Sequence, residues 1–200
     1  MPVECFWLDP TDRVRLSLRR YRSGEVCSAL FGYHNAMVPI GQAPILWSDG
    51  RRTYQAPPVA EYENDPRWPA FCSCGEPFRE TDTWQVTTDR IYVRADNGTE
   101  LILGEAQPGA MYDAEWYPWK GVDGRSLVVI CPDKHPWSID GRASNCTEPN
   151  DNEHRCWLRT GEPPKITVSK SAPGQRSCSA GGGSIGTPGY HGFLVDGRFT

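Results

Sequence analysis

The chain has 200 residues, of which 38% are hydrophobic, and a formal net charge of −4 at pH 7. This length fits one large domain or two small ones, and the dispersed Lys and Arg residues give no basic surface of the kind that binds nucleic acid or anionic lipid. The sequence contains no run of about 18 apolar residues and no secretory signal at its N-terminus, so we expect neither a membrane partner nor export.

Composition also favours a particular fold class. The 20 glycines and 18 prolines indicate short elements joined by many turns, and the eight Trp and eight Tyr residues supply aromatic rings to a core that is poor in Leu, Ile and Val. We therefore predict a mostly β (α+β) fold with small twisted antiparallel sheets, one N-terminal helix and long loops pinned by cysteines. Residues 1–80 would form a loop-rich N-terminal lobe, and residues 81–200 a β-rich C-terminal domain.

The N-terminal helix is predicted over residues 9–21. Asp9 suits the N-cap and Pro10 suits the first helical position. An apolar face would dock this helix on a sheet, with arginines covering the remaining faces. The residues that would share the apolar face are Val14, Leu18 and Tyr21.

A long irregular segment is predicted from Cys27 to Pro69, where prolines break every longer element. A segment of about 40 residues without regular structure needs something to hold it. The turn Cys72-Ser-Cys74-Gly, which closes the segment, can present two sulfurs to one ion. The predicted ligands of a structural zinc ion are Cys27, His34, Cys72 and Cys74, with Cys5 as a substitute for either of the first two. The alternative is a group of buried free cysteines, with His34 bonded to a backbone carbonyl.

Strand signals dominate from Trp84 onward. The pair Asn97-Gly98 between two alternating apolar runs predicts a hairpin. Further strands are predicted at 126–131, from Trp137, and at 162–168, where apolar residues follow turn signals.

A polar stretch between residues 137 and 158 contains Cys146, His154 and Cys156. These three side chains would bind a second ion if Cys131 or Cys178 supplied a fourth ligand. The alternative is a loop whose polar groups bond one another.

The stretch Gly181-Gly-Gly-Ser184 is followed by His191. A nucleophile site would need His191 within hydrogen-bond reach of Ser184, with glycine N–H groups facing a developing oxyanion. The alternative is a turn specified by its backbone, in which the glycines let the chain cross a neighbouring strand.

Four segments of the C-terminal half follow one another in order: Trp137-Ser-Ile-Asp-Gly, Pro164-Lys-Ile-Thr-Val-Ser, Gly183-Ser-Ile and Tyr190-His-Gly-Phe-Leu-Val-Asp-Gly. This order resembles an uncharacterised domain family of bacteria and phages, some members of which are labelled ammonia monooxygenase. Some members accompany bacterial ubiquitin-like conjugation systems and are regarded as serine peptidases. The resemblance implies Ser184 as nucleophile, His191 as base and Asp140 as orienting acid. Because Gly-Gly-Gly-Ser replaces the family's Ser-Pro-Ser, Ser169 and Ser171 are alternative nucleophiles.

Three further segments, Gly109-Ala-Met-Tyr-Asp-Ala, Asp140-Gly-Arg-Ala-Ser-Asn-Cys and His154-Arg-Cys-Trp, belong to a longer match. In these segments and along its whole length the chain is similar to hypothetical proteins of phages that infect actinobacteria. This similarity, with Trp and Tyr suited to interfaces, implies a phage-encoded structural or interaction protein that decorates the virion capsid or binds a host factor.

Its partners would be other virion proteins or a host protein, and homo-oligomerisation stays open. We expect it in the host cytoplasm during infection or in the virion. The alternative function is that of a serine-type hydrolase, a peptidase or isopeptidase, that uses Ser184 and His191. Whether the chain is an enzyme stays open.

Overall fold

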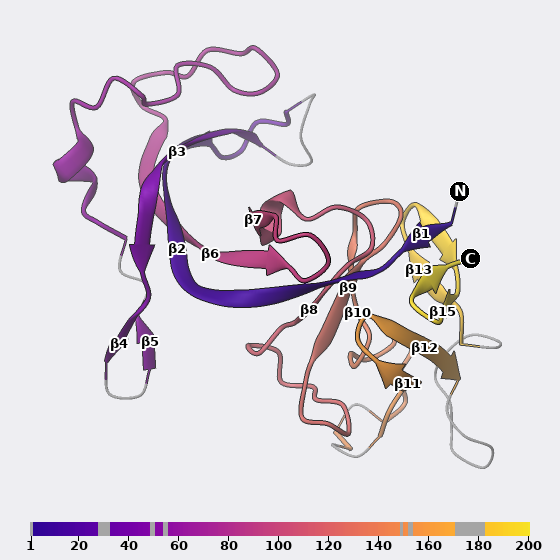
Figure 1. The fold of residues 1–200 in the computed structure, drawn as a ribbon. Helices are drawn as coiled ribbons and strands as arrows, with labels where there is room; N and C mark the ends of the chain where they lie inside the picture. Colours follow the sequence, from indigo (N-terminus) through magenta and orange to yellow (C-terminus); the bar gives the residue numbers. More distant parts are fainter. Residues whose placement is uncertain are drawn as a thin grey trace. The chain divides into compact units, whose positions relative to one another are not determined.

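A computed structural model describes residues 2–27, 33–48, 51–53, 56–148, 150–151, 154–170 and 183–200, and Figure 1 shows its ribbon. Strand accounts for 47% of the structure and helical turns for 5%. The predicted mostly β fold of small sheets is therefore confirmed.

Contacts divide the chain into two compact units: unit 1 is Met1–Asp9 with Val93–Thr200, and unit 2 is Pro10–Tyr92. This division differs from the predicted boundary after residue 80. Strand β1 (Val3–Glu4) pairs with β16 (Arg198–Phe199), which places the start of the chain with its end. At the other boundary, β6 (Thr83–Arg94) stays with unit 2 for most of its length.

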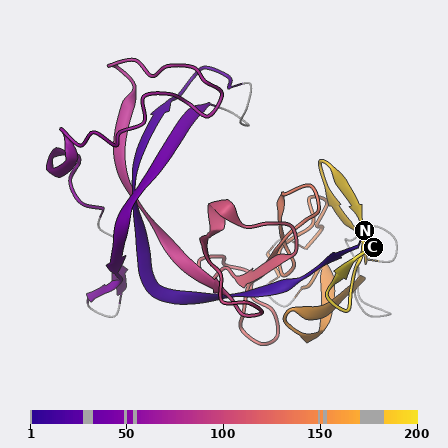
Figure 2. The ribbon, with the colours of Figure 1, turned by 45° about the horizontal axis from the view of Figure 1, so that its top comes forward.

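Unit 2 is built on the long strand β2 (Phe6–Arg22), which lies between β3 (His34–Pro44) and β6 in the strand order β3–β2–β6. Figure 2 shows β3 running along β2. Strands β4 (Leu46–Ser48) and β5 (Arg51–Thr53) form a separate hairpin, and the 3₁₀ helix η1 (Val59–Tyr62) follows them.

The predicted helix at 9–21 is wrong, because this stretch lies in β2. Val14 and Leu18 are four residues apart, a spacing that places two side chains on one face of either a helix or a strand. Both are buried here. The alternation of Val14, Leu16 and Leu18 with polar residues is the strand period, and β3 pairs with β2 from Arg13 onward.

The irregular segment predicted from Cys27 to Pro69 is wrong in part, because it contains β3, β4 and β5. Proline lacks the N–H that a central strand donates on both sides, so it is confined to edge strands and bulges. Among the described strands, β3 pairs only with β2. Pro39 lies opposite Ser17, where the pairing register shifts. An edge position with an irregular register thus lets a proline-containing segment form a strand.

Unit 1 combines short strands and hairpins. Strands β8 (Ala110–Asp113), β9 (Leu127–Ile130) and β10 (Pro136–Ser138) are antiparallel neighbours, and β8 pairs in parallel with the start of β2. The end of β6 pairs with β7 (Glu100–Ile102), followed by η2 (Leu103–Glu105). The predicted hairpin at Asn97-Gly98 is confirmed, since the Arg94 N–H donates to the Thr99 carbonyl over 2.9 Å.

Three further pairings complete unit 1. Strand β11 (Trp157–Glu162) pairs with β12 (Lys165–Lys170), and β13 (Ile185–Thr187) pairs with β14 (Tyr190–Gly192). Strand β15 (Leu194–Val195) pairs with β16.

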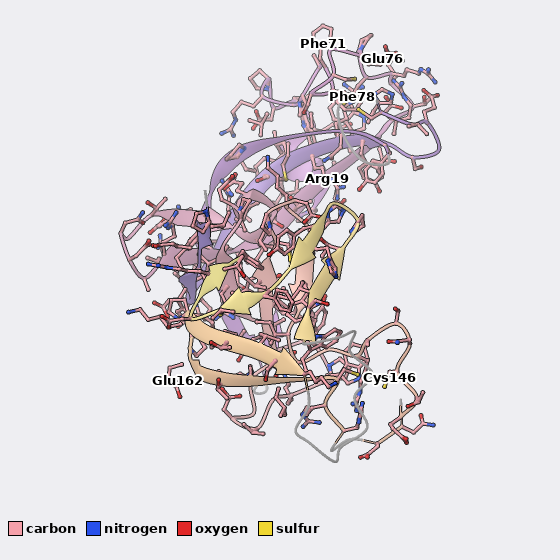
Figure 3. The ribbon with its side chains drawn as sticks, turned by 90° about the vertical axis from the view of Figure 1, so that its right-hand side faces the viewer. Arg19, Phe71, Glu76, Phe78, Cys146 and Glu162 are labelled. Carbon is pink, nitrogen blue, oxygen red and sulfur yellow. The ribbon has the colours of Figure 1, made fainter. Side chains whose placement is uncertain are left out.

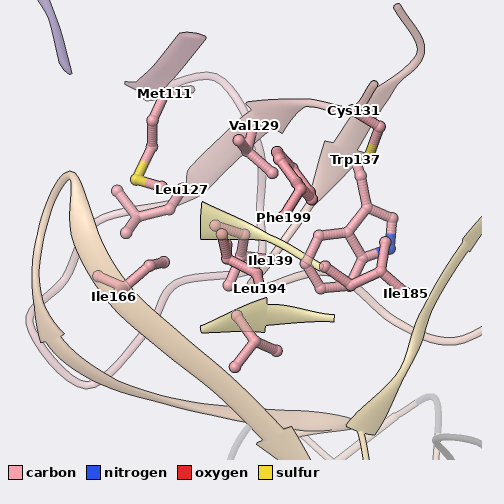
Figure 4. Close-up of a cluster of buried hydrophobic side chains, with 11 residues drawn as sticks. Met111, Leu127, Val129, Cys131, Trp137, Ile139, Ile166, Ile185, Leu194 and Phe199 are labelled. Carbon is pink, nitrogen blue, oxygen red and sulfur yellow. The ribbon is translucent and has the colours of Figure 1, made fainter. Parts of the chain in front are cut away.

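One apolar core holds these short elements together (Figure 4). Each sheet contributes only a few side chains, so the core is shared among all of them. In addition, the ring of Trp137 on β10 meets that of Trp157 on β11 edge to face, with centroids 5.1 Å apart. The buried members of the core are Met111, Leu127, Val129, Cys131, Trp137, Ile139, Ile166, Val168, Ile185, Leu194 and Phe199.

Ile166→Ala should lower the free energy of unfolding by about 2–5 kcal/mol, because it leaves a cavity among these residues. The matched control is Lys165→Ala at the exposed neighbouring position of β12, which should change it by less than about 0.5 kcal/mol. Urea denaturation of the full chain measures both values. Equal losses in the two variants would contradict the assigned core.

Candidate metal centre

The predicted ligand set Cys27, His34, Cys72 and Cys74 comes together in unit 2, where all four donor atoms lie within 4.8 Å of one another. The sulfurs of Cys27 and Cys72 are 3.7 Å apart, and Cys74 Sγ is 3.3 Å from His34 Nδ1. For tetrahedral zinc, the usual bond lengths imply separations of about 3.8 Å between two sulfurs and about 3.5 Å between sulfur and nitrogen. These two separations are close to those around a tetrahedral zinc ion, so the cluster could hold a metal ion.

Cys72 and Cys74 lie on a tight hairpin that fixes both sulfurs. The Cys72 N–H donates to the Glu76 carbonyl over 2.8 Å, and the Gly75 N–H donates to the Cys72 carbonyl over 2.9 Å. Gly75 adopts φ +91°, which favours glycine at this position. Figure 3 labels Phe71, Glu76 and Phe78, which flank the two cysteines.

Cys27 and His34 come from the far end of the β2–β3 hairpin. His34 is the first residue of β3 and lies opposite Arg22, the last residue of β2. Cys27 follows β2 by five residues. His34, Cys27 and Cys72 are buried and Cys74 is half-buried. Two segments far apart in the sequence thus contribute two ligands each.

Backbone N–H groups alter the pKa values of the Cys72 and Cys74 thiols. Burial raises the pKa of Cys72, but hydrogen bonds from the backbone N–H groups of Cys74 and Asn35 outweigh it and lower the pKa to about 6. The Asn35 nitrogen lies 3.3 Å from Cys72 Sγ. The N–H of Glu76 lowers the pKa of Cys74, whereas burial and the sulfurs of Cys72 and Cys27 raise it, with a net rise. Without a cation Cys72 therefore ionises more readily than Cys74, and a divalent ion would stabilise both thiolates.

Two buried arginines anchor the segment that carries the cysteine hairpin. Arg22 donates to both carboxylate oxygens of Asp82, over 3.0 Å in each case, and to the Pro77 carbonyl over 2.9 Å. Arg20 donates to the carbonyls of Pro69 and Arg79. Because Arg20 and Arg22 are two residues apart on a strand, both point to the same face. The expectation of a helix at 9–21 concealed this arrangement.

Cys5 does not substitute for either early ligand. It belongs to unit 1, where it packs against the apolar core, and burial raises the pKa of its thiol to about 12. Such a thiol is a poor metal ligand, because the thiolate is the form that binds.

Unit 2 also contains a pocket of about 460 Å³ that the sequence did not reveal. Its lining residues are Val59, Ala60, Glu63, Trp68 and Trp84. The two indole rings meet edge to face, with centroids 4.8 Å apart, and the Arg20 guanidinium lies 3.8 Å from the Trp84 ring centroid. The lining residues come from separate segments of the sequence. The two tryptophans were therefore the only feature of the sequence that could have pointed to this pocket.

The glycine-rich stretch is described from Gly183 onward, and Ser171, Cys178, Gly181 and Gly182 lie outside the described residues. Gly183 has φ +88°, and a Cβ there would collide with the backbone of Ser169 and Lys170 on β12. This close approach supports a turn in which a glycine lets the chain pass a neighbouring strand.

Ser184, His191 and Asp140 belong to unit 1, and the described part of the chain shows no hydrogen bond that joins any two of them. Ser184 is buried, and its carbonyl accepts from Trp157 Nε1 over 3.4 Å. His191 is exposed, opposite Gly186. Asp140 instead accepts from Arg159 Nε over 2.9 Å and from the Leu127 N–H over 2.8 Å. The alternative nucleophile Ser169 lies in β12, opposite Leu158. Catalysis therefore stays a prediction.

The second cysteine and histidine group is also brought together, since the donor atoms of Cys146, His154 and Cys156 lie within 4.8 Å of one another. Cys131, considered as a further ligand, lies in the core of unit 1 and is not part of this group.

Comparisons with models of protein families, with curated proteins and with solved structures found no match to the chain. Within the described residues, no helix has the length and apolar character needed to cross a membrane. The chemistry of the candidate site must therefore be argued from its own geometry.

A fluorophosphonate probe tests the catalytic alternative. Because Ser184 is buried and not bonded to His191, wild type and Ser184→Ala should show equal, background labelling. Gel fluorescence after incubation with the probe measures this, with a known serine hydrolase as positive control. Labelling that disappears only in Ser184→Ala would establish Ser184 as a nucleophile.

Proposed function

We propose that the protein is a zinc-stabilised structural or interaction protein of a bacteriophage, which binds a virion protein or a host factor through unit 2. The observation that carries this proposal is the convergence of four protein donors within 4.8 Å. Four protein ligands complete the tetrahedral shell of a structural zinc ion, whereas catalytic zinc sites use three and keep one position for substrate or water. Three sulfurs and one imidazole also suit zinc rather than a hard cation such as magnesium.

The cluster and the pocket are built on the same part of unit 2. Trp68 precedes Cys72 by four residues, and its indole N–H donates to the Tyr62 carbonyl over 2.7 Å. Arg20 lies over the Trp84 ring and donates to the carbonyl of Pro69, next to Trp68. An ion that fixes the cysteine hairpin would therefore also fix one wall of the pocket.

The pocket has the character of a protein-binding site. Tryptophans in partly enclosed pockets are typical anchors of interfaces, where a few residues supply most of the binding free energy. Phe71, beside the first cysteine of the hairpin, is 61% exposed and adds an apolar side chain to the surface of unit 2. The occupant we propose is an apolar side chain of another virion protein or of a host protein. The location that we propose, the infected host cytoplasm or the virion, rests on the resemblance to phage proteins alone.

The zinc assignment predicts that the double variant Cys72→Ser with Cys74→Ser, which keeps only two of the four donors, lowers the zinc content of purified protein by one ion per chain. Because binding of a structural ion is also folding free energy, the free energy of unfolding should fall by several kcal/mol. Elemental analysis and urea denaturation measure the two effects. Cys5→Ser is the control, since Cys5 is outside the cluster, and it should keep the full zinc content. Equal zinc in wild type and in the variant Cys72→Ser with Cys74→Ser would refute the site.

The binding assignment predicts that Val59→Asp weakens partner binding at least tenfold, about 1.4 kcal/mol, because a charged side chain would replace an apolar one in the lining of the pocket, where Glu63 already places a carboxyl group. Val122→Asp is the matched control, since Val122 is 91% exposed and lies in unit 1. Quantitative mass spectrometry of purified virions and of complexes from infected cells measures the partner recovered with each variant. Equal recovery with both, or absence from virions together with no host partner, would contradict this function.

A further inference from the structure

We propose that Cys146, His154 and Cys156 form a second zinc site, located in unit 1 and independent of the cluster in unit 2. The three donor atoms lie within 4.8 Å of one another. Cys156 Sγ is 3.5 Å from His154 Nε2, and the separation of sulfur and nitrogen around tetrahedral zinc is about 3.5 Å. The separation of Cys156 Sγ and His154 Nε2 therefore matches that of two donors to one zinc ion.

The fold positions these donors from two sides of one loop. Cys156 is buried and immediately precedes β11, while Cys146 lies at a turn where its N–H donates to the Ala143 carbonyl over 3.0 Å. Figure 3 labels Cys146 on this loop. The guanidinium of Arg142 donates to the carbonyls of Asp151 and His154. The Arg142 side chain thus holds together the part of the loop that carries His154.

The donor set selects the class of metal. Two thiolates and one imidazole are soft or borderline ligands, which favour zinc over calcium or magnesium. Two thiolates also balance the two positive charges of the ion, so binding brings no net charge into this half-buried place. Three protein ligands are the number with which catalytic zinc sites hold their ion, so the set is sufficient for binding.

A bound ion would connect the loop to the core of unit 1. Trp157, which follows Cys156, packs edge to face on Trp137 in that core. The ion would therefore hold Cys146 and His154 close to the start of β11. Because this site has one protein donor fewer than the cluster in unit 2, a chelator should remove its ion first.

Zinc stoichiometry of the full-length protein tests the proposal. After equilibration with excess Zn²⁺ under reducing conditions and removal of free metal, wild type should hold two ions per chain and His154→Ala one. His135→Ala is the matched control, because His135 lies in unit 1 beside Asp133, outside both clusters, and it should hold two. Cys72→Ser with Cys74→Ser should hold one ion, and the triple variant that adds His154→Ala should hold none.

Cobalt(II) provides a second readout that identifies the donors. Its sulfur-to-metal charge-transfer absorbance grows with the number of bound thiolates, so Cys146→Ser with His154→Ala should remove about two-fifths of the absorbance of the fully loaded protein. One ion per wild-type chain that is lost in Cys72→Ser with Cys74→Ser would overturn the second site and leave the first intact. Two ions in His154→Ala would also overturn it, because the second ion would then lie elsewhere.

Discussion

The four donors at the end of the β2–β3 hairpin join a part of unit 2 that has little apolar material of its own. The buried cluster at this place consists of Cys27, Cys72 and Phe78, with Ala36 and Cys74 packed against it. Small apolar clusters rarely offset the conformational entropy that folding removes, and a bound metal is one of the usual remedies. The cysteines contribute twice, because they are both buried apolar side chains and metal donors.

Charge distribution follows from the same arrangement. Three thiolates around a divalent ion leave a net negative charge, and such a charge is stabilised by nearby N–H donors and cations. Asn35 and Cys74 direct backbone N–H groups toward Cys72. Arg22, buried in β2, meets Asp82 rather than a sulfur, so its role is to fix the segment that carries the hairpin. Burying the ion pair of Arg22 and Asp82 costs desolvation free energy. In return, the pair fixes the position of the cysteine hairpin.

The sequence was sufficient to predict the mostly β class and the grouping of Cys27, His34, Cys72 and Cys74. Cysteine and histidine are so typical of zinc sites that these four residues could be grouped although their spacing along the sequence is looser than that of a common zinc motif. It was misleading for residues 9–21, because Asp9 and Pro10 fit a helix start and the four-residue spacing of Val14 and Leu18 fits either a helix or a strand. The tryptophan pocket could not be predicted, since its lining comes together only through tertiary packing. Local sequence patterns thus predicted the metal-binding residue types better than they predicted which strands pair.

The glycine-rich stretch before Ser184 illustrates how one pattern can serve two purposes. A glycine beside a serine can free a backbone N–H for an oxyanion, but it can also remove a Cβ where two backbones meet. At Gly183 the close approach of two backbones is sufficient to require a glycine. Its φ is positive, and the backbone of Ser169 and Lys170 occupies the space that a side chain would need. Ser184, which follows, is buried, whereas His191 is exposed. The geometry of Gly183 is thus explained by the packing of β12 against the start of β13, without a catalytic role.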